Sequence, residues 1–150
     1  MRMSDFNWVN AAFIGCSARA LFVYLHAQVK EDVETITSLD RNTLYEITSE
    51  PTDKKSYQTT PLVVRRAMGA TVTFEMAVGN NLRVQSKLSP GSPDLVHSAK
   101  AFLSDDRTVN YEVCRVENDV QIEREVLTEI WQVSRFFLEP LFYGSFRQAR

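Results

Sequence analysis

The chain has 150 residues and a formal net charge of −2, with 44% hydrophobic and 24% charged residues. These values are ordinary for a globular protein, so they exclude a chain that is disordered over most of its length. Because 150 residues is also a typical domain size, we predict a single domain over residues 1–150.

Cysteine and glycine usage narrows the possible classes of protein. Cys16 and Cys114 are the only cysteines, and two distant cysteines define neither a disulfide framework nor a metal cluster. We interpret them as buried free thiols and predict a cytoplasmic location, where thiols stay reduced. The chain has only five glycines, which weighs against nucleotide-binding folds whose backbone approaches phosphate. We predict no cofactor and no metal ion.

The N-terminal part is rich in apolar side chains, but its periodicity is ambiguous. Arg19 interrupts the apolar run, so we predict no transmembrane segment. Spacings of three and four residues favour a helix, whereas strict alternation after Arg19 favours a strand. We predict a helix over 5–15 and a strand over 19–30, with one long helix as the alternative. Two short strands over 33–39 and 43–48 are expected to follow.

The middle of the chain gives the clearest pattern. Residues 49–60 are polar and predict a loop, and residues 61–66 predict an edge strand. Apolar and polar residues then alternate over 70–88 on both sides of Gly79-Asn80-Asn81. Because glycine and asparagine tolerate positive φ, this pattern predicts a β-hairpin with one buried and one solvated face.

The last third is expected to contain two more helices. We predict a short helix over 94–103, a strand over 107–117 and an amphipathic helix over 119–138, which Pro140 should end or kink at Glu139. The fold class is therefore α+β. An antiparallel sheet of about five to six strands should pack against an N-terminal helix and a long C-terminal amphipathic helix.

No sequence motif points to catalysis. The two histidines, His26 and His97, stand at unrelated positions, and we interpret His97 as a surface side chain at a helix start. Phosphate-binding, dinucleotide-binding, hydrolase and zinc-protease signatures are all missing from the sequence. These observations favour a protein that is not an enzyme.

Charged residues are segregated along the chain. Residues 30–53 hold two basic and seven acidic side chains, residues 54–104 hold seven basic and two acidic ones, and residues 105–130 are acidic again. The basic block could bind anions or nucleic acid, although such domains are usually basic overall. The blocks could instead form solvated faces or meet their opposites on a second copy. The candidate binding residues are Lys54, Lys55, Arg65, Arg66, Arg83 and Lys87.

Aromatic residues are concentrated at the C-terminus. They are Phe136, Phe137, Phe142, Tyr143 and Phe146. Aromatic side chains are enriched at interface anchors, and a cluster of this size must be covered. The segment either folds back over the core or docks on another subunit or partner.

Three functions remain open. The leading hypothesis is a non-enzymatic interaction or assembly protein that forms a homo-oligomer through the aromatic segment, with itself or another protein as partner. The first alternative is a nucleic-acid-binding protein that uses the basic hairpin face. The second is a small-molecule-binding or enzymatic α+β cone with His97 or Asp106 as its polar group.

Overall fold

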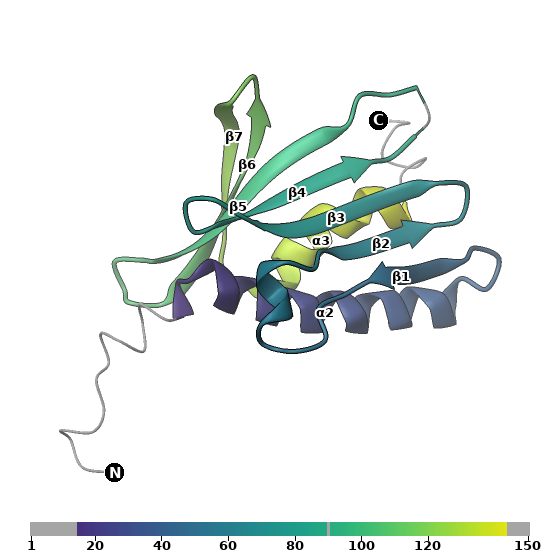
Figure 1. Ribbon diagram of the computed structural model, residues 1–150, viewed down its shortest axis with the longest axis horizontal. Coiled ribbons are helices and arrows are strands. Elements are labelled where there is room, and N and C mark those ends of the chain that lie inside the picture. The colour runs from purple at the N-terminus through teal and green to yellow at the C-terminus, as the bar shows by residue number, and fades with distance from the viewer. Residues whose placement is uncertain (1–14, 90, 144–150) are drawn as a thin grey trace, which may run out of the picture.

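A computed structural model describes residues 15–89 and 91–143, and these residues form an α+β fold (Figure 1). A seven-stranded antiparallel sheet packs against two helices, so the predicted class is confirmed and the expected five to six strands are slightly too few. The elements are α2 (Ala18–Leu39), β1 (Tyr45–Ser49), the 3₁₀ turn η2 (Ser56–Gln58), β2 (Leu62–Arg66), β3 (Ala70–Ala77), β4 (Asn81–Lys87), β5 (Leu95–Leu103), β6 (Val109–Glu117), β7 (Val120–Leu127) and α3 (Ile130–Phe142).

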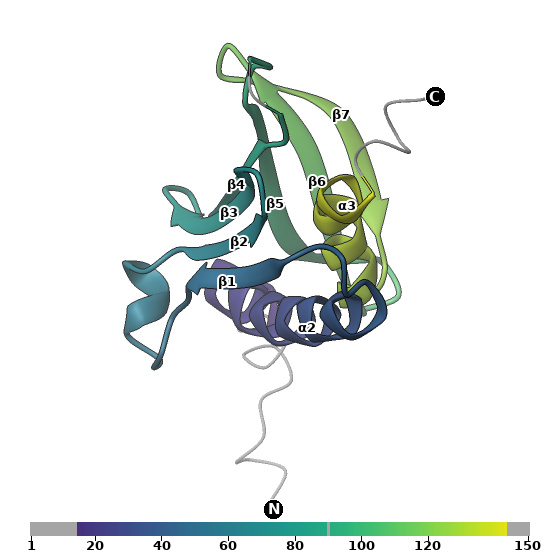
Figure 2. The ribbon, with the colours of Figure 1, turned by 90° about the vertical axis from the view of Figure 1, so that its right-hand side faces the viewer.

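The sheet is a simple meander. The strands lie in the order β1 to β7, and every neighbouring pair is antiparallel. The sheet is strongly curved, and α3 lies on its concave side (Figure 2). Helix α2 runs along β1, the first edge strand of the sheet. Both helices therefore cover the same face, and no helix of the described residues lies on the opposite face (Figures 1 and 2).

Period-two alternation of apolar residues builds the core on the concave face. Val64 lies opposite Val72, and Phe74 lies opposite Val84, and all four are fully buried. The two helices fill the concavity with apolar stripes at helical spacing. The fully or almost fully buried members of these stripes include Leu21, Leu25, Val29, Val133, Phe137 and Leu141.

The strands predicted over 19–30 and 33–39 are wrong, because both ranges belong to α2. The buried positions of α2 recur every three or four residues, which is the period of a helix. They are Ala18, Leu21, Phe22, Leu25, His26, Val29, Val33 and Ile36. The helical alternative is therefore correct from Ala18 onward, and Ser17 caps the helix by accepting a hydrogen bond from the backbone of Ala20. The helix predicted over 5–15 lies outside the described residues except for Gly15.

The predicted short helix over 94–103 is also wrong, because these residues form β5. Ala99 and Ala101 are buried two residues apart, whereas Lys100 between them is exposed. Strand β5 is hydrogen-bonded to β4 on one side and β6 on the other. The strand ladders on both sides outweigh the weak helical preference of this segment.

The helix predicted over 119–138 begins too early. Residues 120–127 form β7, which pairs with β6, and α3 begins only at Ile130. Asn118 and Asp119 have φ angles of 53° and 63°, which is the left-handed conformation of a tight hairpin turn. Polar side chains of this kind form such turns readily, so the dipeptide was the missed signal.

Helix α3 does not end at Glu139, because it runs through Pro140 to Phe142. Proline removes one backbone hydrogen bond from the last turns of the helix. Two side chains from the sheet hold this end instead. Arg66 Nη1 donates to the carbonyl oxygen of Leu141 at 2.8 Å, and Tyr45 Oη donates to the carbonyl oxygen of Phe142 at 3.2 Å.

The other predicted elements are confirmed. Strands β1, β2 and β6 lie within two residues of their predicted bounds, and β3 and β4 form the predicted hairpin. Its turn contains Gly79 and Asn80 at φ angles of 89° and 62°, a conformation that explains why these residue types stand there. The predicted loop over 49–60 contains the short η2 turn, and its first residue, Ser49, is the last residue of β1.

Candidate functional site

The C-terminal aromatic segment lies mostly over the core of its own chain. Phe137 is 2% exposed, and its ring lies 5.7 Å from that of Phe74 on β3. Phe142 packs edge-on against Tyr45 with the ring centroids 5.1 Å apart. Tyr143 is 52% exposed, whereas Phe146 lies outside the described residues. Most of the predicted interface residues therefore make contacts within one chain.

A groove remains between the two helices, and we call it the α2–α3 groove. It has a volume of about 440 Å³, and its walls are largely apolar. Three large apolar side chains on its rim are strongly exposed, with Leu39 at 76%, Trp131 at 48% and Tyr143 at 52%. Leu39 was not among the predicted interface residues, because the sequence pattern placed it in a strand.

Polar contacts fix the geometry of this groove. The buried hydroxyl of Ser134 donates to Asp32 Oδ2 at 2.6 Å, which ties α3 to α2. Gln28 donates to the other oxygen of Asp32 at 3.1 Å. On the rim, Arg135 and Glu139 form an ion pair at 2.7 Å, one helical turn apart on α3. The groove is therefore a preformed feature of two joined helices.

The six basic residues predicted to bind anions do not form one patch. Arg65 pairs with Glu46, and Arg83 pairs with Glu75 at 2.9 Å, both on the helix-free face of the sheet. Arg66 binds the end of α3, as described above. The remaining three are exposed lysines, Lys54 and Lys55 on the β1–β2 loop and Lys87 at the end of β4.

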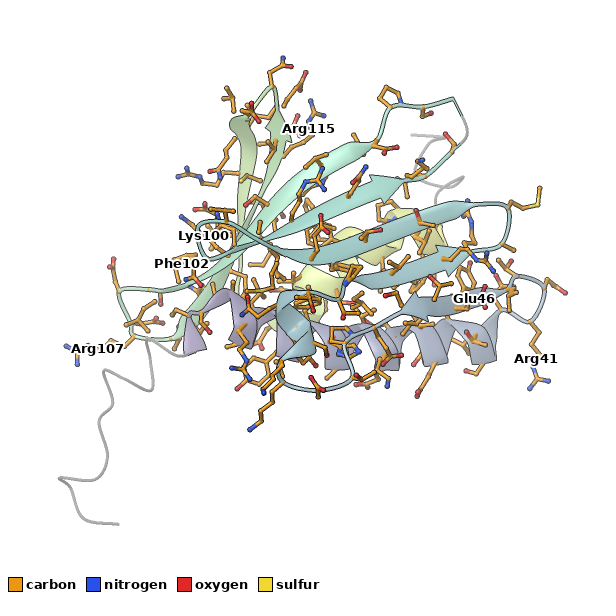
Figure 3. All side chains as sticks on the ribbon, in the orientation of Figure 1. Arg41, Glu46, Lys100, Phe102, Arg107 and Arg115 are labelled. Atoms are coloured by element: carbon orange, nitrogen blue, oxygen red, sulfur yellow. The ribbon has the colours of Figure 1, made fainter. Side chains whose placement is uncertain are left out.

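Other cations are also dispersed over the molecule. Arg41 and Arg107 project from opposite ends of the molecule, and Arg115 lies at a third, separate corner (Figure 3). Because nucleic-acid binding requires a continuous basic surface along the phosphate backbone, this distribution gives the nucleic-acid hypothesis little support.

His97 is not the surface residue at a helix start that the sequence suggested. It lies on β5, with its ring 5.4 Å from that of Phe136 and 5.5 Å from that of Phe137. Its Nδ1 atom is buried and has no hydrogen-bond partner among the described residues. Burial, and then the nearby positive charge of Arg115, lowers the pKa of His97 below its ordinary value of 6.5, while Glu123 acts weakly in the opposite direction.

We expect His97 to make the fold sensitive to mild acid. Because its folded-state pKa is lowered, the unfolded chain binds the proton more readily, so stability falls as the pH drops from above 6.5 through the lowered pKa. His97→Leu should reduce this loss, which chemical denaturation at pH 7.5 and at successively lower pH would measure. The pH series should stop above pH 4.5, which is the ordinary pKa of Glu50. Because the pKa of Glu50 in the folded chain is lower still, its protonation reduces stability only in stronger acid. An equal loss in both proteins would contradict the role of His97.

The second histidine, His26, lies in a hydrogen-bonded network between α2 and the β1–β2 loop. Its Nδ1 atom lies 2.8 Å from Tyr57 Oη, and its Nε2 atom lies 3.1 Å from Glu50 Oε1. Lys30 Nζ contacts the same carboxylate oxygen at 3.1 Å. An ionised carboxylate only accepts hydrogen bonds, so the Nε2 atom of His26 carries a proton and donates to Glu50.

Burial and charge set the ionisation of this network. Burial alone would raise the pKa of Glu50, but hydrogen bonds from Lys30 and His26 outweigh burial and lower it. Burial, followed by the negative charge of Glu50, raises the pKa of Tyr57, so the phenol keeps its proton at neutral pH. His26 itself is only 7% exposed. The carboxylate and the loop tyrosine are thus fixed to α2.

The network borders a second groove, which we call the α2–loop groove. It has a volume of about 1050 Å³ and lies between the first half of α2 and the β1–β2 loop. Figure 1 shows this loop passing in front of α2, and Figure 2 shows the two side by side. Sequence analysis missed the groove because it predicted a strand where α2 forms one wall.

The remaining candidates have structural roles. Asp106 is exposed in the β5–β6 turn, where its carboxylate accepts hydrogen bonds from Ser104 and Thr108, which lower its pKa. Both cysteines are free thiols. Cys114 is buried and Cys16 half-buried, and burial raises the pKa of each. Within residues 15–89 and 91–143, no group of three or more potential ligands is arranged to hold a metal ion.

Comparison of the chain with known protein families, with curated proteins and with solved structures finds no match. Neither described helix combines the length and the apolar character of a membrane span. Function must therefore be inferred from the two grooves and the residues that line them.

Proposed function

We propose that the chain is a non-enzymatic interaction protein that assembles with a second copy of itself through the α2–α3 groove. The observation that carries this proposal is the exposure of Leu39, Trp131 and Tyr143 around one groove. Large apolar side chains that gather on one face mark interaction sites, and tryptophan and tyrosine are enriched among interface residues that dominate binding energy.

The charges on the rim favour a second copy as the occupant. Arg135 and Glu139 stand one turn apart beside Trp131 on α3. In a two-fold dimer the same surface meets itself in reversed direction, so Arg135 of one copy can face Glu139 of the other. The groove is therefore self-complementary in charge, while its apolar walls supply the area that becomes buried.

We expect the unmodified chain to have twice the mass of one chain in solution, and Trp131→Glu to be monomeric. Glutamate would place a charge in the apolar centre of the interface, where it has no partner. Val78→Glu is the matched control, because Val78 is 99% exposed at the β3–β4 turn and does not line the α2–α3 groove. Sedimentation equilibrium over a concentration series measures the masses.

Substitution is a sharper test than removal of residues 141–150. Leu141 is fully buried, so truncation would damage the core as well as the groove. Circular dichroism should confirm that both glutamate variants are folded. A monomeric unmodified chain, or a Trp131→Glu variant that keeps the dimer mass, would contradict the proposal.

A further inference from the structure

The α2–loop groove has a wall with a regular arrangement of side chains. Arg19, Val23, His26 and Lys30 are spaced by four, three and four residues, so they form one stripe on α2 that faces the groove. Segment 50–54 and Tyr57 form the facing wall. The volume of about 1050 Å³ is at the upper end of the range of small-molecule sites in proteins.

In the inner part of the groove, the negative charge of Glu50 is already paired within the protein. His26 is buried, and its two ring nitrogens contact Tyr57 and Glu50. Lys30 forms an ion pair with the same glutamate. These contacts satisfy the negative charge of Glu50 within the protein and hold both walls at a fixed separation. A ligand would therefore meet a preformed surface, which lowers the entropic cost of binding.

The rim of the groove, in contrast, has cations in excess. Arg19 and Lys54 are exposed and come from opposite walls, and neither forms an ion pair with another described residue. Asp53 is an acidic residue on the same rim, and one of its carboxylate oxygens accepts hydrogen bonds from the backbone N–H groups of Lys55 and Ser56. Two cations that face one cavity from separate elements favour an anionic ligand.

The groove also has an apolar surface. Tyr24 is 57% exposed and Val23 is 38% exposed, and both are among its lining residues. An exposed aromatic ring gives a flat platform for a planar group and is costly to leave bare to water. The combination of an aromatic side chain and two cations that line one groove favours a ligand that has an apolar body and an anionic head.

We propose that the α2–loop groove binds a small organic anion, an aromatic carboxylate or phosphate ester. Its anionic head lies between Arg19 and Lys54, and its flat body lies on Tyr24 and Val23. The arginine guanidinium offers paired donors that match the oxygens of a carboxylate or a phosphate. Recognition needs both halves of the ligand, because an inorganic anion leaves the platform bare and a neutral aromatic leaves the cations unpaired. This site is independent of the α2–α3 groove, since the two share no lining residue.

Titration of the full chain with naphthyl phosphate and with naphthoate, followed by ligand-detected NMR and calorimetry, tests the site. Inorganic phosphate and naphthol are the half-ligands, and both should bind more weakly than the whole ligand by about tenfold or more. A variant that combines Arg19→Gln with Lys54→Gln should weaken binding of the whole ligand by about tenfold or more, since it removes both charges that face the head.

A matched control separates a site from general attraction by charge. The pair Arg41→Gln and Lys87→Gln also removes one arginine and one lysine, but both residues are exposed and lie outside the groove. This control should bind as the unmodified chain does. Failure of both naphthyl anions to bind, equal binding of inorganic phosphate, or equal weakening in the two variant pairs would each overturn the proposal.

Discussion

Phe137→Ala is expected to lower the free energy of unfolding by about 3–5 kcal/mol, the range for truncation of a buried aromatic side chain. Phe137 is 2% exposed and contacts three other rings, those of Phe74, His97 and Phe136. Removal of this ring leaves a cavity between α3 and the concave face of the sheet, which the neighbouring rings cannot fill without moving.

Phe137→Leu separates loss of volume from loss of apolar character. Leucine keeps an apolar side chain in the same place, so its cost should be clearly smaller than that of alanine. Urea denaturation followed by tryptophan fluorescence measures both changes. If alanine and leucine cost the same small amount, α3 would not be anchored in the core through this ring, and the aromatic segment would be available to a partner instead.

The sequence predicted the middle of the sheet correctly because several local signals agree there. Over β3 and β4 the apolar residues alternate, and Gly79 and Asn80 supply the turn that the alternation requires. Each signal depends only on residues close in the chain. Agreement between pattern, strand propensity and turn chemistry therefore made the hairpin predictable without any tertiary information.

The errors occurred where local signals compete and distant contacts decide. Residues 19–30 fit both a strand and a helix, and burial of Leu21, Leu25 and Val29 against the sheet selects the helix. Residues 120–127 are largely exposed on an edge strand, so they carry almost no burial pattern. Pairing with β6 defines that strand, and pairing partners cannot be read from the segment itself.

Neither groove could be predicted from sequence, because each brings together segments that are distant in the chain. His26 is 24 residues from Glu50 and 31 from Tyr57, and Ser134 is 102 residues from Asp32. Part of the charge segregation along the chain corresponds to an ion pair in the fold. Arg65 from the basic block pairs with Glu46 from the acidic block that precedes it in the sequence. This pairing neutralises one of the residues of the predicted basic patch.

Helix α2 connects the two proposed sites. Its first half lines the α2–loop groove, and its last turns, with Asp32, Ile36 and Leu39, line the α2–α3 groove. Each site uses a different stripe of the same helix, while a third stripe is buried against the sheet. Residues of α2 thus line both grooves, and a change that loosens the packing of α2 on the sheet should affect both sites.

Phe22→Ala is expected to be the most damaging change in α2, with a loss of about 3–5 kcal/mol in the free energy of unfolding. Phe22 is fully buried, and its ring meets that of Tyr57 edge-on at 5.2 Å. Tyr57 in turn contacts His26, so the cavity would loosen the loop as well as the helix. We therefore expect the variant to lose binding of naphthyl phosphate under conditions in which it is still folded.

Tyr24→Ala is the matched control for Phe22→Ala, because it removes an aromatic ring two residues away that is 57% exposed. Its effect on the free energy of unfolding should stay within about 0.5 kcal/mol, as for most surface substitutions. Its effect on binding should nevertheless be large, because Tyr24 forms the platform of the groove. Calorimetric unfolding and ligand titration of both variants thus separate a scaffold residue from a binding residue on one helix. If Tyr24→Ala destabilised the fold as much as Phe22→Ala does, the assignment of buried and exposed faces in α2 would be wrong.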